Sequence, residues 1–253
     1  MPQYGDQEVC PDCRGTGWQY AEGKGARPCA CRQTRIIQNA TQNLISSANI
    51  PPRFRLASFD NFETYCRSLQ NALNRCRRFA DQYPVVNTGL LLQGNPGVGK
   101  THLAIAVLNA LLAKDTPVLF YDVRELLKTI QESYSQTARA SELKILSPAL
   151  DAEVLVLDEL GAAKPTEWVQ EAMTFIINRR YNYCKTTIFT TNYLDHPIGS
   201  SYDETLADRV GARIRSRLHE MSSRILIEGE DYRSRLDNQS EPPKLTLLNK
   251  PGS

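Results

Sequence analysis

Residues 94–101 read GNPGVGKT and match the phosphate-loop pattern G-x-x-x-x-G-K-[ST] at each fixed position. The glycines let successive backbone N–H groups point inward, which makes a nest for an anion at the start of a helix. Lys100 would neutralise the β- and γ-phosphates of a nucleotide, and the Thr101 hydroxyl would ligate Mg²⁺. The nucleotide-binding residues that we expect, with the first-turn residue His102 beside them, are Gly94, Asn95, Pro96, Gly97, Val98, Gly99, Lys100, Thr101 and His102.

Two adjacent carboxylates follow a second apolar run. Residues 154–157 read VLVL, which is typical of a buried strand, and Asp158 and Glu159 come directly after them. Ligands of open α/β sheets bind at the carboxyl ends of the strands, so this pair would face the phosphate loop. We expect Asp158 to hold Mg²⁺ through water and Glu159 to orient or deprotonate the attacking water.

A third strand, in the segment TTIFTTN, ends at Asn192. If this strand neighbours the other two in the sheet, Asn192 can reach the γ-phosphate or the attacking water. Asparagine is also a common turn former at the end of a strand, and that interpretation stays open.

Four cysteines near the N-terminus have the spacing of a metal site. Cys10 and Cys13 form a C-x-x-C pair, and Cys29 and Cys31 form a later C-x-C pair. Four thiolates from two short knuckles suit tetrahedral Zn²⁺, although a redox C-x-x-C is the main alternative. Residues 1–34 have almost no aliphatic side chains, so zinc would supply the folding free energy that a core supplies elsewhere. The remaining cysteines lie in apolar helical patterns and are expected in the core: Cys66, Cys76 and Cys184.

These sites need a framework that brings strand ends together. After residue 88, short apolar runs alternate with helical patterns, which indicates a parallel sheet covered by helices on both faces. Between residues 65 and 83, apolar residues recur at three- and four-residue steps, and this spacing predicts an amphipathic helix. We therefore expect a zinc module at residues 1–34, a helical connector at 35–83, an α/β core at 84–236 and a disordered tail at 237–253.

Composition excludes several classes of protein. The 253 residues carry 30 Lys and Arg against 28 Asp and Glu, so net charge favours neither nucleic acid nor any other charged partner. The apolar content of 41% excludes a wholly disordered chain, and no apolar run reaches the ~18–20 residues of a membrane span. The N-terminal residues lack the pattern of a secretion signal, so we expect a cytoplasmic protein with no membrane contact.

The motifs GNPGVGKT, LVLDEL and IFTTN together resemble those of the AAA+ ATPases. The finer pattern resembles bacterial helicase loaders of the DnaC/DnaI type and the related IstB transposition ATPases. Further similarities are IPPRFRLASFDNF, FIINRRY, and GARIRSRL followed by EGEDYRSR, so the resemblance covers roughly residues 48–236. It implies a P-loop AAA+ fold with ATP and Mg²⁺ as ligands. Too few residues follow Arg217 for a full C-terminal lid domain, and loaders of this type also lack one.

In this family, GARIRSRL is similar to the stretch that places an arginine finger in the nucleotide site of a neighbouring subunit. The match implies that Arg217, with Arg213 one helical turn earlier, completes the site in trans. Hydrolysis would then require an ATP-dependent homo-oligomer. From the residues alone, an exposed basic helix is the alternative.

The resemblance also implies a site for single-stranded DNA. Loaders carry a helical insert after the second core strand, and residues 126–146 occupy that position. Lys128, Arg139 and Lys144 would contact phosphates, and Tyr134 would be a stacking platform. A polar helix packed on the surface is the alternative.

The N-terminal region is expected to hold a protein partner. The segment CPDCRGTGW is similar to the zinc knuckles of the DnaJ chaperone type, and a closed four-cysteine site is structural rather than catalytic. In loaders this region grips the helicase, so residues 1–50 are expected to bind a replicative DNA helicase, or a transposase. Direct DNA contact by the knuckle is the second interpretation.

The sequence favours an ATP-dependent DNA replication protein that loads a replicative helicase, binds ATP and single-stranded DNA, and hydrolyses ATP at subunit interfaces. The alternative is an IstB-like ATPase that assists transposition target selection. Two hypotheses belong to other classes: a P-loop small-molecule kinase, and a zinc-stapled nucleic-acid adaptor with a degenerate nucleotide site. The intact Lys100, Thr101, Asp158 and Glu159 disfavour the adaptor.

Overall fold

The computed structural model describes residues 10–21, 25–32, 43–134, 139–196 and 204–235. The chain divides into two compact units, residues 1–47 and residues 48–253. The expected tail, residues 237–253, lies outside the described residues. In the described part, no helix is long and apolar enough to cross a membrane.

The second unit is built on a five-stranded parallel sheet with the order β4-β5-β6-β3-β7. The alternation of short apolar runs with helical patterns after residue 88 predicted such a sheet, because parallel strands are commonly buried on both faces. Their bounds are β3 Gly89–Gly94, β4 Val118–Asp122, β5 Val154–Asp158, β6 Thr186–Thr191 and β7 Ser222–Ile227.

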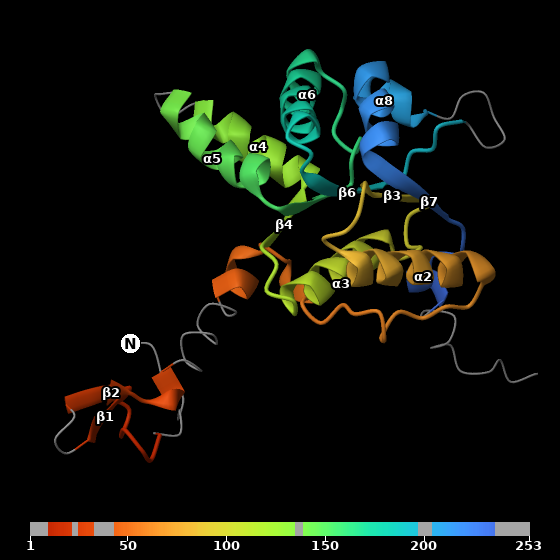
Figure 1. Cartoon of the computed structure of the whole chain (residues 1–253). Helices are drawn as coiled ribbons and strands as arrows, with labels where there is room; N and C mark the ends of the chain where they lie inside the picture. Colours follow the sequence, from red (N-terminus) through yellow and green to blue (C-terminus); the bar gives the residue numbers. More distant parts are fainter. Residues whose placement is uncertain (1–9, 22–24, 33–42, 135–138, 197–203, 236–253) are drawn as a thin grey trace, which may run out of the picture. The chain divides into compact units, whose positions relative to one another are not determined.

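Helices cover both faces of this sheet (Figure 1). On one face lie α2 (Arg67–Gln82) and α3 (Lys100–Leu112), which pack against each other. On the other face, helices pack on a cluster formed by Leu91, Leu155, Leu157 and Phe189 of the strands. These helices are α4 Val123–Tyr134, α5 Arg139–Asp151, α6 Glu167–Asn182, α7 Leu206–Val210 and α8 Ala212–Met221. The predicted α/β fold with a parallel sheet between helices is therefore confirmed.

Polar side chains of α2 cover the outer edge of β7. Arg75 Nη1 donates to the carbonyl oxygen of Arg224 at 2.7 Å, and Ser68 Oγ donates to that of Leu226 at 3.4 Å. The opposite edge of the sheet is β4. There, Phe120 N donates to Ala48 O at 2.9 Å, and the segment 48–49 adds a second bond through the side chain of Asn49 to Phe120 O, at 3.0 Å. Both outer strands thus have backbone groups that are already hydrogen-bonded.

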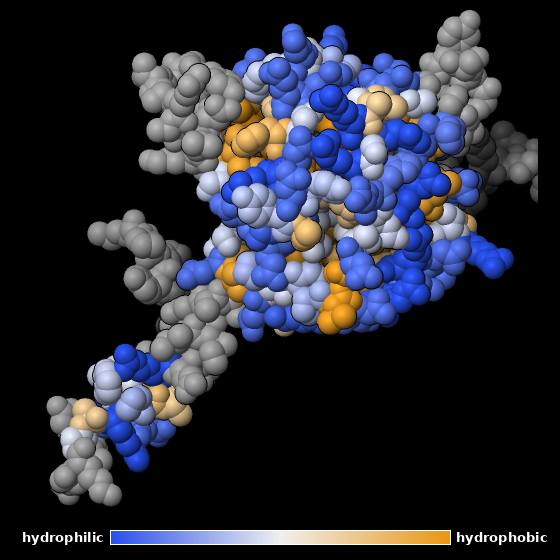
Figure 2. Space-filling view, turned by 45° about the horizontal axis from the view of Figure 1, so that its top comes forward, coloured by the Kyte–Doolittle hydropathy of each residue, from blue (hydrophilic) through white to orange (hydrophobic). Residues whose placement is uncertain are grey.

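The three cysteines expected in the core have different environments. Cys76 of α2 is fully buried, as predicted, and burial raises the pKa of its thiol to about 12. Cys66 is only half-buried and is the N-cap residue of α2. Cys184 is exposed in the turn after α6, so its assignment to the core was wrong. Figure 2 shows hydrophilic residues over most of the visible face of the second unit, with hydrophobic residues in scattered patches.

The first unit contains a short antiparallel hairpin of β1 (Trp18–Ala21) and β2 (Gly25–Pro28), with Trp18 opposite Pro28. The guanidinium of Arg32 lies 4.2 Å from the centroid of the Trp18 ring. Among the described residues of this unit, the buried apolar side chains are cysteines. The hairpin therefore has no aliphatic core of its own, as the composition of the segment indicated.

Candidate functional site

The predicted phosphate loop connects β3 to α3, as its motif requires. Gly97 and Gly99 adopt φ angles of 79° and 89°, which favour glycine. A Cβ atom on Gly97 would lie 2.0 Å from Asp231 Oδ1, and one on Gly99 would lie 2.5 Å from Phe62 Cε2. Both glycines are thus needed for the backbone conformation and for the close approach of segments from the two ends of the unit.

Lys100 is buried and reaches across the loop. Its Nζ donates to the carbonyl oxygens of Gly94 at 2.8 Å and Asn95 at 2.7 Å. Burial lowers the pKa of Lys100 to about 8, and the nearby carboxylates of Asp158 and Glu159 oppose this shift. The ammonium group therefore lies within the loop that would bind a phosphate. Its hydrogen-bond acceptors are uncharged carbonyl groups, so its positive charge is not neutralised by them.

Asp158 lies at the end of β5 and faces the loop. Thr101 Oγ1 donates to it at 3.0 Å, and Thr190 Oγ1 of β6 donates at 2.5 Å. The residue is only 5% exposed, and burial raises its pKa to about 6, although the two hydroxyl groups favour the ionised form. Thr101 and Asp158 thus meet, as the magnesium prediction required, and they offer the oxygen ligands that Mg²⁺ prefers.

Glu159 follows Asp158 but lies in a different environment. It adopts φ 57°, and its backbone N–H donates to Thr190 Oγ1 at 2.9 Å. Its half-exposed carboxylate forms an ion pair with Arg124, the second residue of α4. This pairing was not predicted from the sequence, because nothing in the local pattern around Arg124 indicates it.

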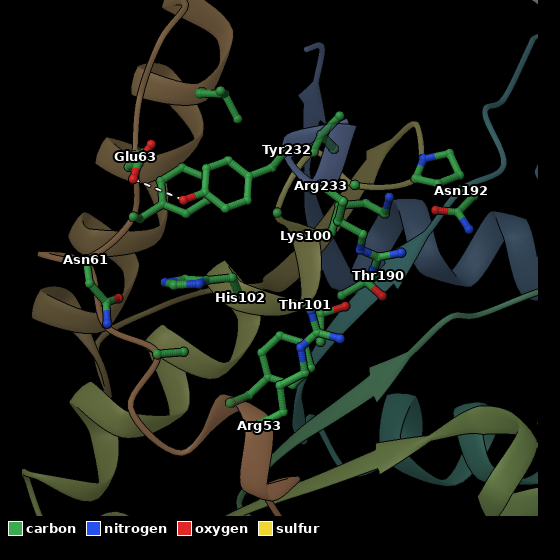
Figure 3. A pocket seen from close by; sticks show the side chains of 18 of the residues that line it. Arg53, Asn61, Glu63, Lys100, Thr101, His102, Thr190, Asn192, Tyr232 and Arg233 are labelled. Atoms are coloured by element: carbon green, nitrogen blue, oxygen red, sulfur yellow. Dashed lines mark hydrogen bonds between the residues drawn. The ribbon is translucent and has the colours of Figure 1, made fainter. Parts of the chain in front are cut away.

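Asn192 follows β6, and β6 lies between β3 and β5. The strand is therefore the sheet neighbour that the sequence prediction required. Asn192 lines the same cavity as Lys100, Thr101 and Glu159, and Figure 3 labels it among the lining residues. Its proposed contact with a γ-phosphate or with water stays a prediction.

The loop opens into a cavity of about 450 Å³. Two segments that the sequence analysis did not assign to the site form its other walls. One is the irregular connector at residues 53–65, and the other is the turn that follows β7. The residues that these two segments contribute are Arg53, Phe54, Leu56, Ala57, Asn61, Phe62, Glu63, Tyr65, Tyr232 and Arg233.

Hydrogen bonds join these two walls. Tyr232 N donates to Gly97 O at 3.1 Å, and Tyr232 Oη donates to Glu63 Oε1 at 3.0 Å (Figure 3). Tyr65 Oη donates to the carbonyl oxygen of Glu230 at 2.6 Å. The short turn after β7 thus forms one wall of the cavity.

His102 also lines the cavity. Its Nε2 lies 3.0 Å from Ser58 O, and its ring centroid lies 5.4 Å from that of Phe62. These contacts give His102 a definite role in holding the connector against the phosphate loop.

Arg213 and Arg217 lie on α8 and do not line the cavity of their own subunit. Arg213 is exposed, and the guanidinium of Arg217 lies 5.7 Å from the centroid of the Tyr181 ring. This location agrees with a contribution to another subunit, and that role stays a prediction.

The residues predicted to contact DNA are described only in part. Lys128 of α4 is exposed and lies 3.8 Å from Glu132 in an ion pair. The side chains of Tyr134, Arg139 and Lys144 lie outside the described part of the structure. The second half of α5 buries Leu146, Ala149 and Leu150 in the core, so that half packs against the sheet.

In the first unit, the four predicted ligands meet. The sulfur atoms of Cys10, Cys13, Cys29 and Cys31 all lie within 4.8 Å of one another. Cys10 and Cys29 are 3.9 Å apart, and Cys13 and Cys31 are 3.2 Å apart. A tetrahedral site with Zn–S bonds of about 2.3 Å has sulfurs about 3.8 Å apart, so this set fits Zn²⁺. Gly17 N donates to Cys13 Sγ at 3.3 Å, which is a backbone contact to a sulfur of the first knuckle.

The sheet order, the phosphate loop after β3 and the acidic pair after β5 define a P-loop protein of the AAA+ class. Within this class, residues 27–240 match the family model of the IstB-like ATP-binding proteins. The chain belongs to this family.

Sequence relatives support the assignment. The chain is 25% identical over 220 residues to the replicative helicase loader DnaC of Escherichia coli (strain K12), covering 87% of this chain and 85% of that protein. It is 28% identical over 193 residues to the uncharacterized protein YdaV of the same strain, covering 76% of each.

Solved structures agree. A crystal structure of the DnaC helicase loader matches with a TM-score of 0.62 and 34% identity, covering 70% of this chain and 100% of the other. A crystal structure of DnaI matches with a TM-score of 0.58 and 26% identity, covering 75% of this chain and 98% of the other. The initiator DnaA bound to AMPPCP and single-stranded DNA has a TM-score of 0.58, covering 75% and 56%, but at 18% identity the likeness concerns the fold alone.

Proposed function

We propose that this protein is an ATP-dependent loader of a replicative helicase. It binds ATP with Mg²⁺ in the cavity beside the phosphate loop and hydrolyses it at contacts between subunits. The observation that carries the proposal is that Lys100 and Thr101 line this cavity and that Thr101 donates a hydrogen bond to Asp158. The similarity to DnaC over 87% of the chain supplies the biological context.

Different residues of the site bind the phosphates, hold Mg²⁺ and act on the attacking water. The loop N–H groups and Lys100 bind the phosphates, while Thr101 and Asp158 hold Mg²⁺, which screens phosphate charge when bound. Glu159 accepts a proton from the attacking water once its carboxylate is free of Arg124, and Asn192 orients that water or the γ-phosphate. The walls at residues 53–65 and 232–233 exclude bulk water from the nucleotide.

Arg217 completes this site from the neighbouring subunit, assisted by Arg213. A guanidinium supplied in trans stabilises charge on the transferred phosphoryl group. Hydrolysis therefore requires that subunits assemble. The absence of both arginines from the cavity lining of their own subunit supports this assignment.

The two remaining partners bind elsewhere. The unit at residues 1–47 holds the helicase, with Zn²⁺ bound by Cys10, Cys13, Cys29 and Cys31 as a structural staple. Single-stranded DNA binds along α4 and α5, where Lys128 is an exposed cation. ATP and DNA promote assembly, and hydrolysis releases the helicase.

Turnover measurements test the catalytic part of the proposal. We expect weak ATP hydrolysis that rises with single-stranded DNA and is lost in Lys100→Ala and Arg217→Ala. Arg179→Ala is the matched control, because Arg179 also lies over a tyrosine, with its guanidinium 4.0 Å from the Tyr183 ring centroid. Full DNA-stimulated turnover by Arg217→Ala would show that the finger assignment is wrong.

A second candidate function is assistance to a transposase, and the IstB-like family match favours it. Both candidates use the same ATPase site and differ in the protein that residues 1–47 hold. Pull-downs with purified helicase and purified transposase, each with and without ATP, distinguish them. Capture of the transposase alone would replace the helicase-loader proposal.

A further inference from the structure

Asp195 is a buried carboxylate surrounded by the side chains of two arginines and a histidine. It lies three residues after Asn192, and its side chain is only 2% exposed. Arg215 Nε donates to it at 2.8 Å, Arg224 Nη1 donates at 2.6 Å, and His219 Nε2 lies at 3.1 Å. Charge-assisted hydrogen bonds of this kind fix geometry as well as contribute free energy.

The partners of Asp195 belong to two elements, α8 and β7. Arg215 and His219 are four residues apart on α8, so they share one face of that helix. Arg217 lies between them in sequence and points to a different side of the helix. Asp195 therefore holds α8 by one face and leaves the proposed finger residue free to reach outward.

A second link ties the preceding helix to the catalytic turn. Arg209 of α7 donates through Nε to Gly161 O at 2.8 Å and through Nη2 to Ala163 O at 3.0 Å, in the turn that follows Glu159. The pair α7–α8 is thus bonded to both strand ends of the site, the end of β5 through Arg209 and the end of β6 through Asp195.

We propose that Asp195 is a positioning residue that fixes α8 on the end of β6, so that Arg217 reaches the nucleotide of the neighbouring subunit. The inference rests on the proposed function. A shift of about 1 Å in a group that acts on the reaction costs up to roughly 100-fold in rate. Ile214 and Leu218 still pack α8 into the core when this link is removed, so the helix stays folded but changes its position.

Asp195 could support only the end of its own strand, or it could act through α8, and the two cases predict different results. If Asp195 only supports its own strand end and Asn192, its loss damages the nucleotide site of the same subunit. If it acts through α8, the loss damages the site of the next subunit and leaves its own site competent. Mixed oligomers separate the two cases.

The experiment mixes Asp195→Asn subunits with Lys100→Ala subunits, which cannot use their own nucleotide but still offer an intact Arg217. Alone, Asp195→Asn is expected to lose about 10- to 100-fold in DNA-stimulated kcat, with KM for ATP changed less than about twofold. In the mixture, turnover is expected to recover to at least a quarter of the level that mixed wild-type and Lys100→Ala subunits give. Absence of recovery overturns the proposal.

A parallel mixture tests the proposed function separately. Arg217→Ala mixed with Lys100→Ala must recover turnover if the finger acts in trans. If that mixture fails, the proposed function fails and the role of Asp195 falls with it. If it recovers and the Asp195→Asn mixture does not, only the role of Asp195 is wrong.

Two further variants control for folding. Arg215→Gln removes the ion pair between Arg215 of α8 and Asp195, at a side chain that is 33% exposed. It must reproduce both the loss of kcat and the recovery of turnover in the mixture. Arg224→Gln removes the β7 partner and leaves the bonds to α8, so its turnover should stay within about twofold of wild type. Equal losses in Arg215→Gln and Arg224→Gln would overturn the proposal.

Discussion

The carboxylate of Glu159 is ion-paired with the guanidinium of Arg124. Glu159 is the expected acceptor of the proton from water, and Arg124 stands at the start of α4, the first helix of the proposed DNA-binding element. In this pair the Glu159 carboxylate is engaged by Arg124, so it must leave the pair before it can accept a proton from water. The pair therefore connects the chemistry of the site to the helix that would contact DNA.

Removal of Arg124 should weaken the dependence of hydrolysis on DNA. We expect Arg124→Ala to raise the basal ATPase rate several-fold and to lower the ratio of stimulated to basal turnover. Arg77→Ala is the control. It breaks an exposed ion pair, 2.9 Å long, between Arg77 of α2 and Asp60 of the irregular connector. A basal rate that falls in Arg124→Ala would mean that the pair supports catalysis instead.

Nucleotide affinity should decrease at alkaline pH. Burial lowers the pKa of Lys100 to about 8, whereas the phosphates of ATP bind its protonated form. Above this pH the free protein loses the proton and must regain it on binding, so affinity should fall by up to about tenfold per pH unit. Calorimetry at pH 8.5 in buffers of different ionisation enthalpy should detect proton uptake. Lys100→Arg should remove the pH dependence, and constant affinity from pH 7 to 9 would contradict the assignment.

Asp195 should stabilise the fold at neutral pH but not in strong acid. Burial alone would raise its pKa, but the hydrogen bonds from Arg215, Arg224 and His219 outweigh burial and lower the pKa to about 2, below the ordinary value of 3.8. A depressed carboxyl pKa contributes stability above the ordinary value and loses it as pH falls through the folded-state value. The difference in free energy of unfolding between wild type and Asp195→Asn should be about 2 kcal/mol above pH 5 and should decrease between pH 4 and 2. Urea titrations at several pH values measure it, and a constant difference would disprove the linkage.

Loss of zinc should unfold the first unit and spare the second. We expect one Zn²⁺ per chain by elemental analysis, lost in Cys13→Ser because three sulfurs cannot close the tetrahedral site. Hydrogen exchange should then become fast at residues 10–32 and stay slow in the sheet of the second unit. Cys184→Ser, at an exposed cysteine, should keep its zinc. Unchanged exchange after metal removal would show that the hairpin folds without it.

The sequence predicted the strands, the phosphate loop and the cysteine site because each has a local signature. Continuous apolar runs mark β3 and β5, and fixed spacing marks the ligand sets. The neighbours of β6 were left as a condition in the sequence analysis. The structure has β6 between β3 and β5, and this order brings Asn192 to the cavity.

The walls of the cavity could not be predicted in the same way. The bond between Tyr232 and Glu63 joins residues 169 positions apart, and no periodicity reports such a contact. No periodicity predicts the partners of Asp195 either, because Arg215 and His219 come from α8 and Arg224 comes from β7. Cys184 was misassigned because the apolar pattern of α6 ends just before it, at a turn with φ 50°.

Both borders of the sheet are already occupied, β7 by Arg75 and Ser68 of α2 and β4 by residues 48–49. An incoming chain finds no unsatisfied ladder to extend at these bonds, so strand addition is disfavoured as a mode of association. Contacts with other molecules are then left to side chains on helices and loops. The same covering limits edge-to-edge aggregation through the borders of the sheet.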